Sequence, residues 1–261
     1  MPKVLDLPTI KELYKAGAHF GHLRSRSDAR SRDFIFTYRN RVAVIDLEKA
    51  IKSIETTLQF IQRVSQEGGQ FIFVGTKMQA KDEIKRVADE LKMPYIIERW
   101  PGGLITNFEV VDKSIKKMMK TEKDLSENKL DHLKKKERLK IEKDLAKTKK
   151  IFGGLSTMSQ KPDALIVIDA KEELIAINEA KKANVPIIAI CDTNSNPRSI
   201  EYPIVVNDDS RSTIILIMNL INQTIKQNFK SKRIESDEAG ERAEKALDPK
   251  PTPKAKKETV K

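Results

Sequence analysis

Hydrophobic residues along most of this chain follow two alternating periods, and the alternation predicts an α/β fold. Short apolar runs, typical of buried strands, cover residues 41–46, 70–74, 94–97, 164–168, 187–191 and 204–206. Apolar residues at helical spacing follow or separate these runs, at 47–67, 77–91, 172–183 and 210–229. This order predicts a parallel sheet with right-handed crossovers and with helices on both faces.

An insertion interrupts the alternation at residues 107–150. It holds 14 lysines among residues 113–150 and only seven acidic residues. Its sparse apolar residues predict a narrow helix–helix seam; they are Ile115, Met118, Met119, Leu125, Leu133, Ile141, Leu145 and Phe152. We expect an antiparallel helical hairpin, a coiled coil, that projects from a globular domain of residues 1–106 and 151–229. One continuous helix is the alternative.

Residues 230–261 have a different composition from the rest of the chain. Lys, Glu, Ala and Pro dominate, aromatic residues are absent, and three prolines interrupt the last part of the segment. Such a segment cannot bury enough apolar surface to order itself. We expect a disordered, lysine-rich tail.

The charge balance makes the chain a candidate for binding a polyanion. Fifty Lys and Arg residues face 38 Asp and Glu residues, so the formal net charge is +12. Nucleic acid is the commonest polyanionic partner of a basic protein. A soluble basic protein without such a partner would show the same excess.

Three features predict a soluble protein of the cytoplasm that has no contact with a membrane. Cys191 is the only cysteine, which fits a reducing compartment, and it ends an apolar run, which fits a buried thiol. The N-terminus lacks the apolar stretch of a signal peptide. The most apolar helical segment, 214–221, is too short to span a bilayer.

Arginines gather in an N-terminal extension of the globular domain. Six of them fall within 18 residues, opposed by only Asp28 and Asp33: Arg24, Arg26, Arg30, Arg32, Arg39 and Arg41. Arginine favours bidentate contact with phosphate, so we expect this stretch to carry most of an RNA affinity. Phe34, Phe36 and Tyr38 are interleaved with the arginines. They could be core strand residues or stacking platforms for bases, and we expect them mostly in the core.

Two further segments supply candidate RNA-binding residues. Lys77 follows Gly75 in a turn between a strand and a helix, and a helix N-terminus with a lysine can hold a phosphate. The spacing of a nucleotide-binding Walker loop is absent, so a simple tight turn is the alternative. Arg99 and Trp100 precede a Pro-Gly-Gly turn, where they either bind RNA or cover an edge of the sheet.

Aspartates after the predicted strands provide the best argument for an enzyme; they are Asp169, Asp192, Asp208 and Asp209. The carboxyl ends of parallel strands would gather them where open α/β sheets bind ligands. They could hold Mg²⁺, or zinc together with His19, in a metal-dependent phosphatase or nuclease. We favour helix caps and Asx turns instead. No nucleophile–base pair is evident, and His19 and His22 lack further zinc ligands nearby.

A set of short motifs occurs in order along the chain: Ala16-Gly-Ala-His-Phe-Gly-His22, Phe36–Asn40, Val44–Leu47, Phe73–Lys77 with Gln79-Ala80, Arg99–Phe108, Gly153-Gly154, Pro162-Asp163, Ile168-Asp169, Glu179-Ala180, Asp192–Asn194 and Asn207–Asp209. Each motif alone is weak, but the ordered set, over roughly residues 8–225, is highly specific. This set resembles the family of the second ribosomal protein of the bacterial small subunit, the S-two family.

The resemblance implies a flavodoxin-like sheet with a coiled-coil insertion and a place on ribosomal RNA between the head and body of the small subunit. It also implies neighbouring ribosomal proteins, proximity to the messenger-binding protein S-one in bacteria that possess it, and no catalytic activity. Three positions depart from the family pattern: Ser27-Asp-Ala29 replaces Trp-Asn-Pro, Thr37 a glycine and Pro101 a leucine. The first change bears on RNA contacts near Asp28.

We therefore predict a structural, RNA-binding constituent of the small ribosomal subunit with no catalytic residue, cofactor or metal. The candidate contacts are Arg24, Arg26, Arg30, Arg32, Arg39, Arg41, Lys77, Arg99 and Trp100. A metal-dependent phosphate enzyme that uses the aspartates is the alternative. A protein-interaction module would explain the hairpin but not the arginine-rich stretch.

Overall fold

The computed structural model describes residues 7–127, 129–130, 134–158 and 160–247, with side chains as far as Phe229. Its centre is a five-stranded sheet in the order β5-β4-β6-β7-β8, with all neighbours parallel. The strands are β4 (Phe71–Val74), β5 (Tyr95–Ile96), β6 (Ala164–Ile168), β7 (Ile187–Cys191) and β8 (Tyr202–Val205). Along the chain this is a 2-1-3-4-5 order, which confirms the predicted flavodoxin-like sheet.

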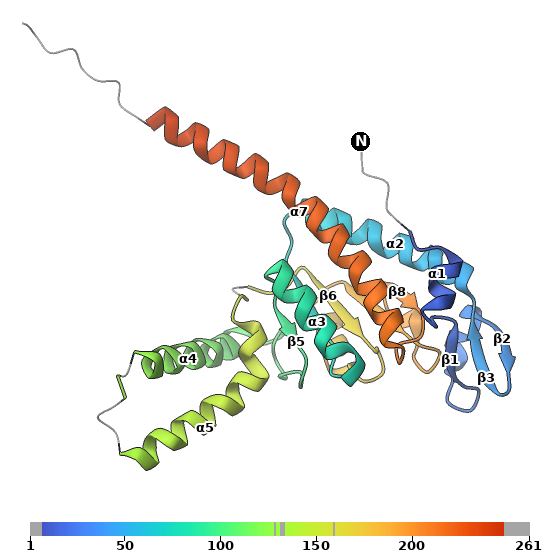
Figure 1. Cartoon of the computed structure of the whole chain (residues 1–261), viewed down its shortest axis with the longest axis horizontal. Helices are drawn as coiled ribbons and strands as arrows, with labels where there is room; N and C mark the ends of the chain where they lie inside the picture. The colour runs from blue at the N-terminus through green and yellow to red at the C-terminus, as the bar shows by residue number, and fades with distance from the viewer. Residues whose placement is uncertain (1–6, 128, 131–133, 159, 248–261) are drawn as a thin grey trace, which may run out of the picture.

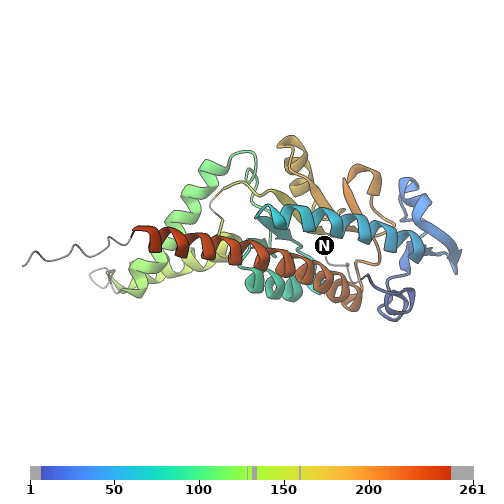
Figure 2. The ribbon, with the colours of Figure 1, turned by 90° about the horizontal axis from the view of Figure 1, so that it is seen from above.

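Helices cover both faces of the parallel sheet, as Figures 1 and 2 show. On one face lie α2 (Leu47–Gln66), α3 (Met78–Leu91) and α7 (Arg211–Leu247), and on the other lies α6 (Leu174–Lys182). Successive side chains of a strand point to opposite faces. Phe71 and Phe73 of β4 therefore join the first core, while Ile72 and Val74 join the second.

A second, antiparallel sheet lies at one end of the molecule, beside the short helix α1 (Ile10–Lys15) (Figure 1). We call it the small sheet; it contains β1 (Phe20–Leu23), β2 (Ile35–Arg39) and β3 (Val42–Ile45) in the order β1-β3-β2. Asn40 and Arg41 join β2 to β3 with φ angles of 50° and 66°, as a two-residue type I′ hairpin requires. The sequence predicts a strand with bounds only at β3, as residues 41–46, and counts it towards the parallel sheet. That assignment was wrong, because β3 pairs antiparallel with β1 and β2. For β2 the sequence offers Phe36 and Tyr38 as core strand residues without bounds, and it offers no strand for β1.

The insertion contains two helices, α4 (Phe108–Ser126) and α5 (Lys135–Phe152), in place of one continuous helix. They extend away from the parallel sheet at the end opposite the small sheet (Figure 1). The close seam of a coiled coil is not confirmed. Ile115 and Met118 are buried near the base of α4, but α5 buries none of its side chains, and a groove of about 570 Å³ separates the helices. Leu133, part of the predicted seam, lies outside the described residues.

The base of the insertion packs tightly against β5. The chain returns from α5 through the 3-10 helix η2 (Gly153–Leu155). A Cβ atom at Gly154 would lie 2.3 Å from the carbonyl oxygen of Tyr95. Only glycine permits this approach.

Helix α7 continues beyond Phe229, where the sequence predicts its end, to Leu247. Its C-terminal part extends away from the body in Figure 1. Residues 248–261, the rest of the predicted tail, lie outside the described residues, so the disorder of the tail stays a prediction. No helix in the described part of the chain is long and apolar enough to cross a membrane.

We predict that the outer part of the hairpin is dispensable for folding. Replacing residues 120–149 with a short Gly-Ser loop retains the buried Ile115 and Met118. The free energy of unfolding in urea should therefore fall by no more than about 1 kcal/mol, with one cooperative transition.

The matched comparison is Ile115→Ala in the full chain. This side chain is 2% exposed, so its truncation should cost about 2–5 kcal/mol. A loop-replaced domain that loses its cooperative transition would show that the outer hairpin belongs to the folding core.

Candidate nucleic-acid interface

The six arginines of the N-terminal extension are exposed on the small sheet and its flanking turns. Arg30 is the one of these six arginines that makes an ion pair with a described residue: its Nε and Nη2 donate to the two carboxylate oxygens of Asp28 at 2.9 and 2.7 Å. The other five make no ion pair with any described residue: Arg24, Arg26, Arg32, Arg39 and Arg41. Asp33, the second acid of this stretch, pairs with Arg198 instead. Five guanidinium groups thus remain available to an anion outside the chain.

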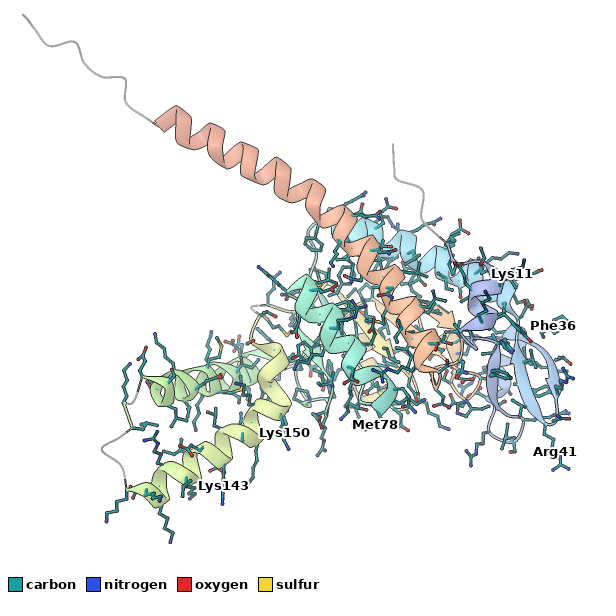
Figure 3. The ribbon with its side chains drawn as sticks, viewed as in Figure 1. Lys11, Phe36, Arg41, Met78, Lys143 and Lys150 are labelled. Atoms are coloured by element: carbon teal, nitrogen blue, oxygen red, sulfur yellow. The ribbon has the colours of Figure 1, made fainter. Side chains whose placement is uncertain are left out.

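These arginines lie far from the lysines of the hairpin. Figure 3 shows Arg41 and Phe36 at the outer end of the small sheet, while Lys143 and Lys150 lie on α5 at the other end of the molecule. The structure therefore presents two separate basic regions.

The aromatic residues of β2 correct one prediction. Phe36 is 75% exposed and Tyr38 is 37% exposed, so the expectation that they belong to the core was wrong. The register of β2 against β3 shifts between Ile35 and Thr37, which leaves Phe36 without a partner position on β3. The guanidinium of Arg24 lies 5.1 Å from the centre of the Tyr38 ring, a cation–π distance.

Thr193, in the loop after β7, fastens the small sheet to the parallel sheet. Its hydroxyl oxygen accepts a hydrogen bond from the amide of His22 at 2.9 Å. Its carbonyl oxygen accepts from the amide of Asp28 at 2.7 Å and from the hydroxyl of Ser31 at 2.8 Å. A Cβ atom at Gly21 would lie 2.7 Å from the Thr193 methyl group, so β1 can approach only because Gly21 is glycine.

Lys77 is engaged within the protein. Its Nζ lies 2.6 Å from Asp208, 2.6 Å from Asp209 and 3.1 Å from Asp169. These residues follow β4, β6 and β8, so the strand ends gather them as expected from their sequence positions. Lys77 thus reaches from the turn after β4 across the strand ends, to residues that follow β6 and β8. This edge of a flavodoxin-like sheet is the one that usually binds a ligand. This geometry removes Lys77 from the candidate RNA contacts.

His22 connects β1 to the same carboxylates. Its Nδ1 lies 3.0 Å from Asp192, its Nε2 lies 3.6 Å from Asp209, and the side chain of Asn194 lies 3.1 Å from Nε2. The hydrogen bond to Asp192 raises the pKa of His22 above its ordinary value, against the opposing effect of burial. We call Lys77, His22 and the four aspartates Asp169, Asp192, Asp208 and Asp209 the ion cluster.

Burial and mutual repulsion decide the charges inside the ion cluster. Burial, with the nearby Asp169 and Asp192, raises the pKa of Asp208 to about 7. Burial alone would lower the pKa of Lys77, but its hydrogen bonds to Asp208 and Asp209 outweigh that effect and raise it. Lys77 therefore stays charged, and the cluster retains a proton more readily than free aspartates would.

The histidine at the aspartates is His22, which corrects the expectation that His19 would join them. His19 stacks on Tyr14 and packs against Phe20, with ring centres 4.3 and 4.0 Å apart. Among the described residues, His22, Asp192 and Asp209 form the one group whose ligand atoms lie close enough for a metal, within 4.8 Å. Lys77 already pairs with Asp209, and His22 already pairs with Asp192. We therefore assign this group a structural role.

The remaining candidates divide between surface and core. The amide of Thr76, which a phosphate at this turn would use, donates to Glu173 at 2.9 Å. Trp100 is 5% exposed and packs in the core beneath α6 and α4, so it is not available for stacking on bases. Arg99 alone of these candidates is exposed. Cys191 is fully buried, and burial raises the pKa of its thiol to about 12.

Known proteins show which family shares this sequence and fold. The family model for ribosomal protein S2 matches residues 13–228, which span both sheets and the hairpin. The chain belongs to the ribosomal protein S2 family. The resemblance inferred from the sequence motifs is thereby confirmed.

Similar proteins carry the name small ribosomal subunit protein uS2. The one from Salinibacter ruber is 39% identical over 230 residues, which cover 88% of this chain and 72% of that protein. The one from Flavobacterium johnsoniae is 40% identical over 235 residues, with coverage of 90% and 92%. The one from Porphyromonas gingivalis is 38% identical over 227 residues, with coverage of 87% and 81%.

We predict that pH acts on stability through His22. Because its pKa is raised on folding, the folded state binds more protons than the unfolded state. The contribution of His22 to stability is then complete below about pH 6.5 and is lost as the pH rises through the raised pKa, by no more than about 1.4 kcal/mol per pH unit. Asp208, whose pKa burial raises to about 7, adds a decline of its own up to about pH 7, which His22→Gln retains.

Urea unfolding at a series of pH values between 5.5 and 8.5 measures this effect. His22→Gln should flatten the decline, and His19→Gln, for which burial lowers the pKa, should not. Equal slopes in the wild type and in His22→Gln would contradict the role given to the His22–Asp192 pair.

Proposed function

We propose that this chain is a structural constituent of the small ribosomal subunit and that it binds small-subunit ribosomal RNA through the small sheet. One observation supports the small sheet as the RNA-binding surface: five exposed arginines of this region have no ion-pair partner among the described residues. Family membership supports the ribosomal assignment, since the relatives are named as proteins of the small subunit.

The chemistry of the small sheet favours recognition of RNA backbone and shape. Guanidinium groups pair with phosphate oxygens in a bidentate manner. The major groove of an A-form helix is too narrow for side chains, so these arginines contact phosphates and hydroxyl groups instead of base edges. The proposed contacts are Arg24, Arg26, Arg30, Arg32, Arg39 and Arg41, with Arg99 as a separate contact beside β5.

Neighbouring ribosomal proteins and the RNA share the rest of the surface in this proposal. The lysines of the hairpin supply a second basic region at the other end of the molecule (Figure 3). Proximity to the messenger-binding protein S-one is an inference from the family resemblance. As a ribosomal constituent the chain acts in the cytoplasm. A metal-dependent enzyme is not proposed, because Lys77 and His22 engage the aspartates that it would need.

The test removes three unpaired arginines together. Purified protein should bind small-subunit ribosomal RNA with a steep salt dependence, because each neutralised phosphate releases condensed counterions. Changing Arg24, Arg26 and Arg32 to Gln should flatten the slope of log affinity against log salt by about two to three units. Filter binding or fluorescence anisotropy at several salt concentrations gives the slope.

A matched control removes equal charge from the C-terminal end. Lys254, Lys256 and Lys257, outside the described residues, are changed to Gln. We expect a smaller effect because the sequence predicts disorder there, and a disordered segment must lose entropy to make each contact. An unchanged slope in the arginine variant with a large loss in the lysine variant would place the RNA surface at the C-terminal end instead.

A further inference from the structure

A cavity remains open beside the ion cluster, on the other side of the β6 strand end. It measures about 350 Å³ and lies between α6, the loop that follows β7, and the arginine-rich extension. The volume falls at the lower end of the roughly 300–1,000 Å³ typical of small-molecule sites. The position, outside the carboxyl ends of parallel strands, is the one that open α/β sheets use for ligands.

Apolar side chains form the inner wall of this cavity. Ala170, Ile177 and Ile200 are 5%, 2% and 6% exposed and belong to the core. Leu174, one turn before Asn178 on α6, is 52% exposed at the cavity. A flat apolar ligand would cover this leucine, whose exposure is costly in water.

Polar side chains surround the apolar wall, and most of them already have partners within the protein: Asn194 at His22, Asn196 at the amide of Arg198, and Ser195 and Ser199 at backbone carbonyls. Asn178, Asn194 and Asn196 line the cavity together with Ser195 and Ser199. The side chain of Asn178 makes no hydrogen bond with the described residues. Because an amide offers both donors and acceptors, it can pair with the edge of a nucleobase.

The cavity carries positive charge. Arg30, Lys171 and Lys181 line it, and Asp28 is the acidic residue among the lining residues. Asp28 is already bound by Arg30 through two hydrogen bonds. Lys171 and Lys181 are exposed and make no ion pair within the described part of the chain. Both ammonium groups are therefore available to phosphate.

We propose that the cavity receives one unpaired nucleotide of the bound RNA, with its base against Leu174 and Asn178 and its flanking phosphates at Lys171 and Lys181. The proposal rests on the RNA-binding function and adds a defined subsite to it. Proteins recognise unpaired bases by holding them against apolar side chains and bonding to their edges. Arg30 belongs both to the arginine stretch and to the cavity, so one RNA strand can contact both.

The test compares similar, neighbouring side chains of α6, of which one lines the cavity and the other does not. Leu174→Ala is paired with Ile175→Ala, because Ile175 is 61% exposed and does not line the cavity. Lys181→Gln is paired with Lys182→Gln on the same grounds. Leu174 and Lys181 line the cavity, and Ile175 and Lys182 do not. All four residues are exposed, so each variant should fold, which circular dichroism checks.

Binding to small-subunit ribosomal RNA and chemical probing of its 2′-hydroxyl groups give the readout. Leu174→Ala should weaken binding about five- to tenfold, in the range of losing one base contact. It should also restore reactivity at one unpaired nucleotide that wild-type protein protects. Lys181→Gln should reduce the salt slope by about one unit. Ile175→Ala and Lys182→Gln should match the wild type.

Three results would overturn the assignment, and each has a different meaning. Equal affinity and protection for Leu174→Ala and Ile175→Ala would remove the subsite while leaving the arginine surface intact. Failure of the wild-type protein to bind the RNA would remove the proposed function as well. Binding of adenosine or uridine monophosphate as tight as that of the RNA, lost in Leu174→Ala, would assign the cavity to a free nucleotide.

Discussion

The ammonium of Lys77 lies among Asp169, Asp208 and Asp209, and the placement of the small sheet depends on this contact. Carboxylates that meet at neighbouring strand ends repel one another, so they share a buried edge by pairing with cations or by keeping a proton. Lys77 supplies a cation from the turn after β4, and His22 of β1, whose pKa is raised by its hydrogen bond to Asp192, adds a second positive charge when it is protonated. The ion cluster thereby holds the loop that contains Thr193, to which the small sheet is hydrogen-bonded.

The same contact determines what the fold can do. A flavodoxin-like sheet offers a ligand crevice at its strand-order reversal, between β4 and β6. Here Lys77, which follows β4, pairs with Asp169, which follows β6, and Glu173 accepts a hydrogen bond from the amide of Thr76. Groups of the protein itself therefore occupy this edge of the sheet. The free charge lies outside, on arginines that the fixed small sheet presents to an external polyanion. In the function proposed above, a scaffold common among nucleotide-binding enzymes serves as a rigid support for RNA contacts.

The sequence predicts the parallel sheet well because its strands are short apolar runs buried on both faces; β6 and β7 begin and end at the predicted residues. It does not predict β1 and β2, whose pairing depends on a tight turn and on the close approach of Gly21 to Thr193. The exposed arginines are predictable from composition. That Lys77 is enclosed and that His22 replaces His19 at the aspartates are tertiary facts, set by residues more than 90 positions apart. That Arg30 pairs with Asp28, two residues away, is a local contact that depends on the backbone conformation of this turn.

Hydrogen exchange of the small sheet in Lys77→Met tests this account most directly, with Lys81→Met on the same helix as the control. Loss of a partner from a buried ion cluster costs about 3–5 kcal/mol, so amides of residues 20–45 should exchange on the order of a hundredfold faster or more. Those of β6 and β7 should lose no more protection than the fall in global stability that urea unfolding of the same variant measures, and Lys81→Met should match the wild type. Protection of residues 20–45 in Lys77→Met that falls no further than that of β6 and β7 would contradict the claim that the ion cluster holds the small sheet in place.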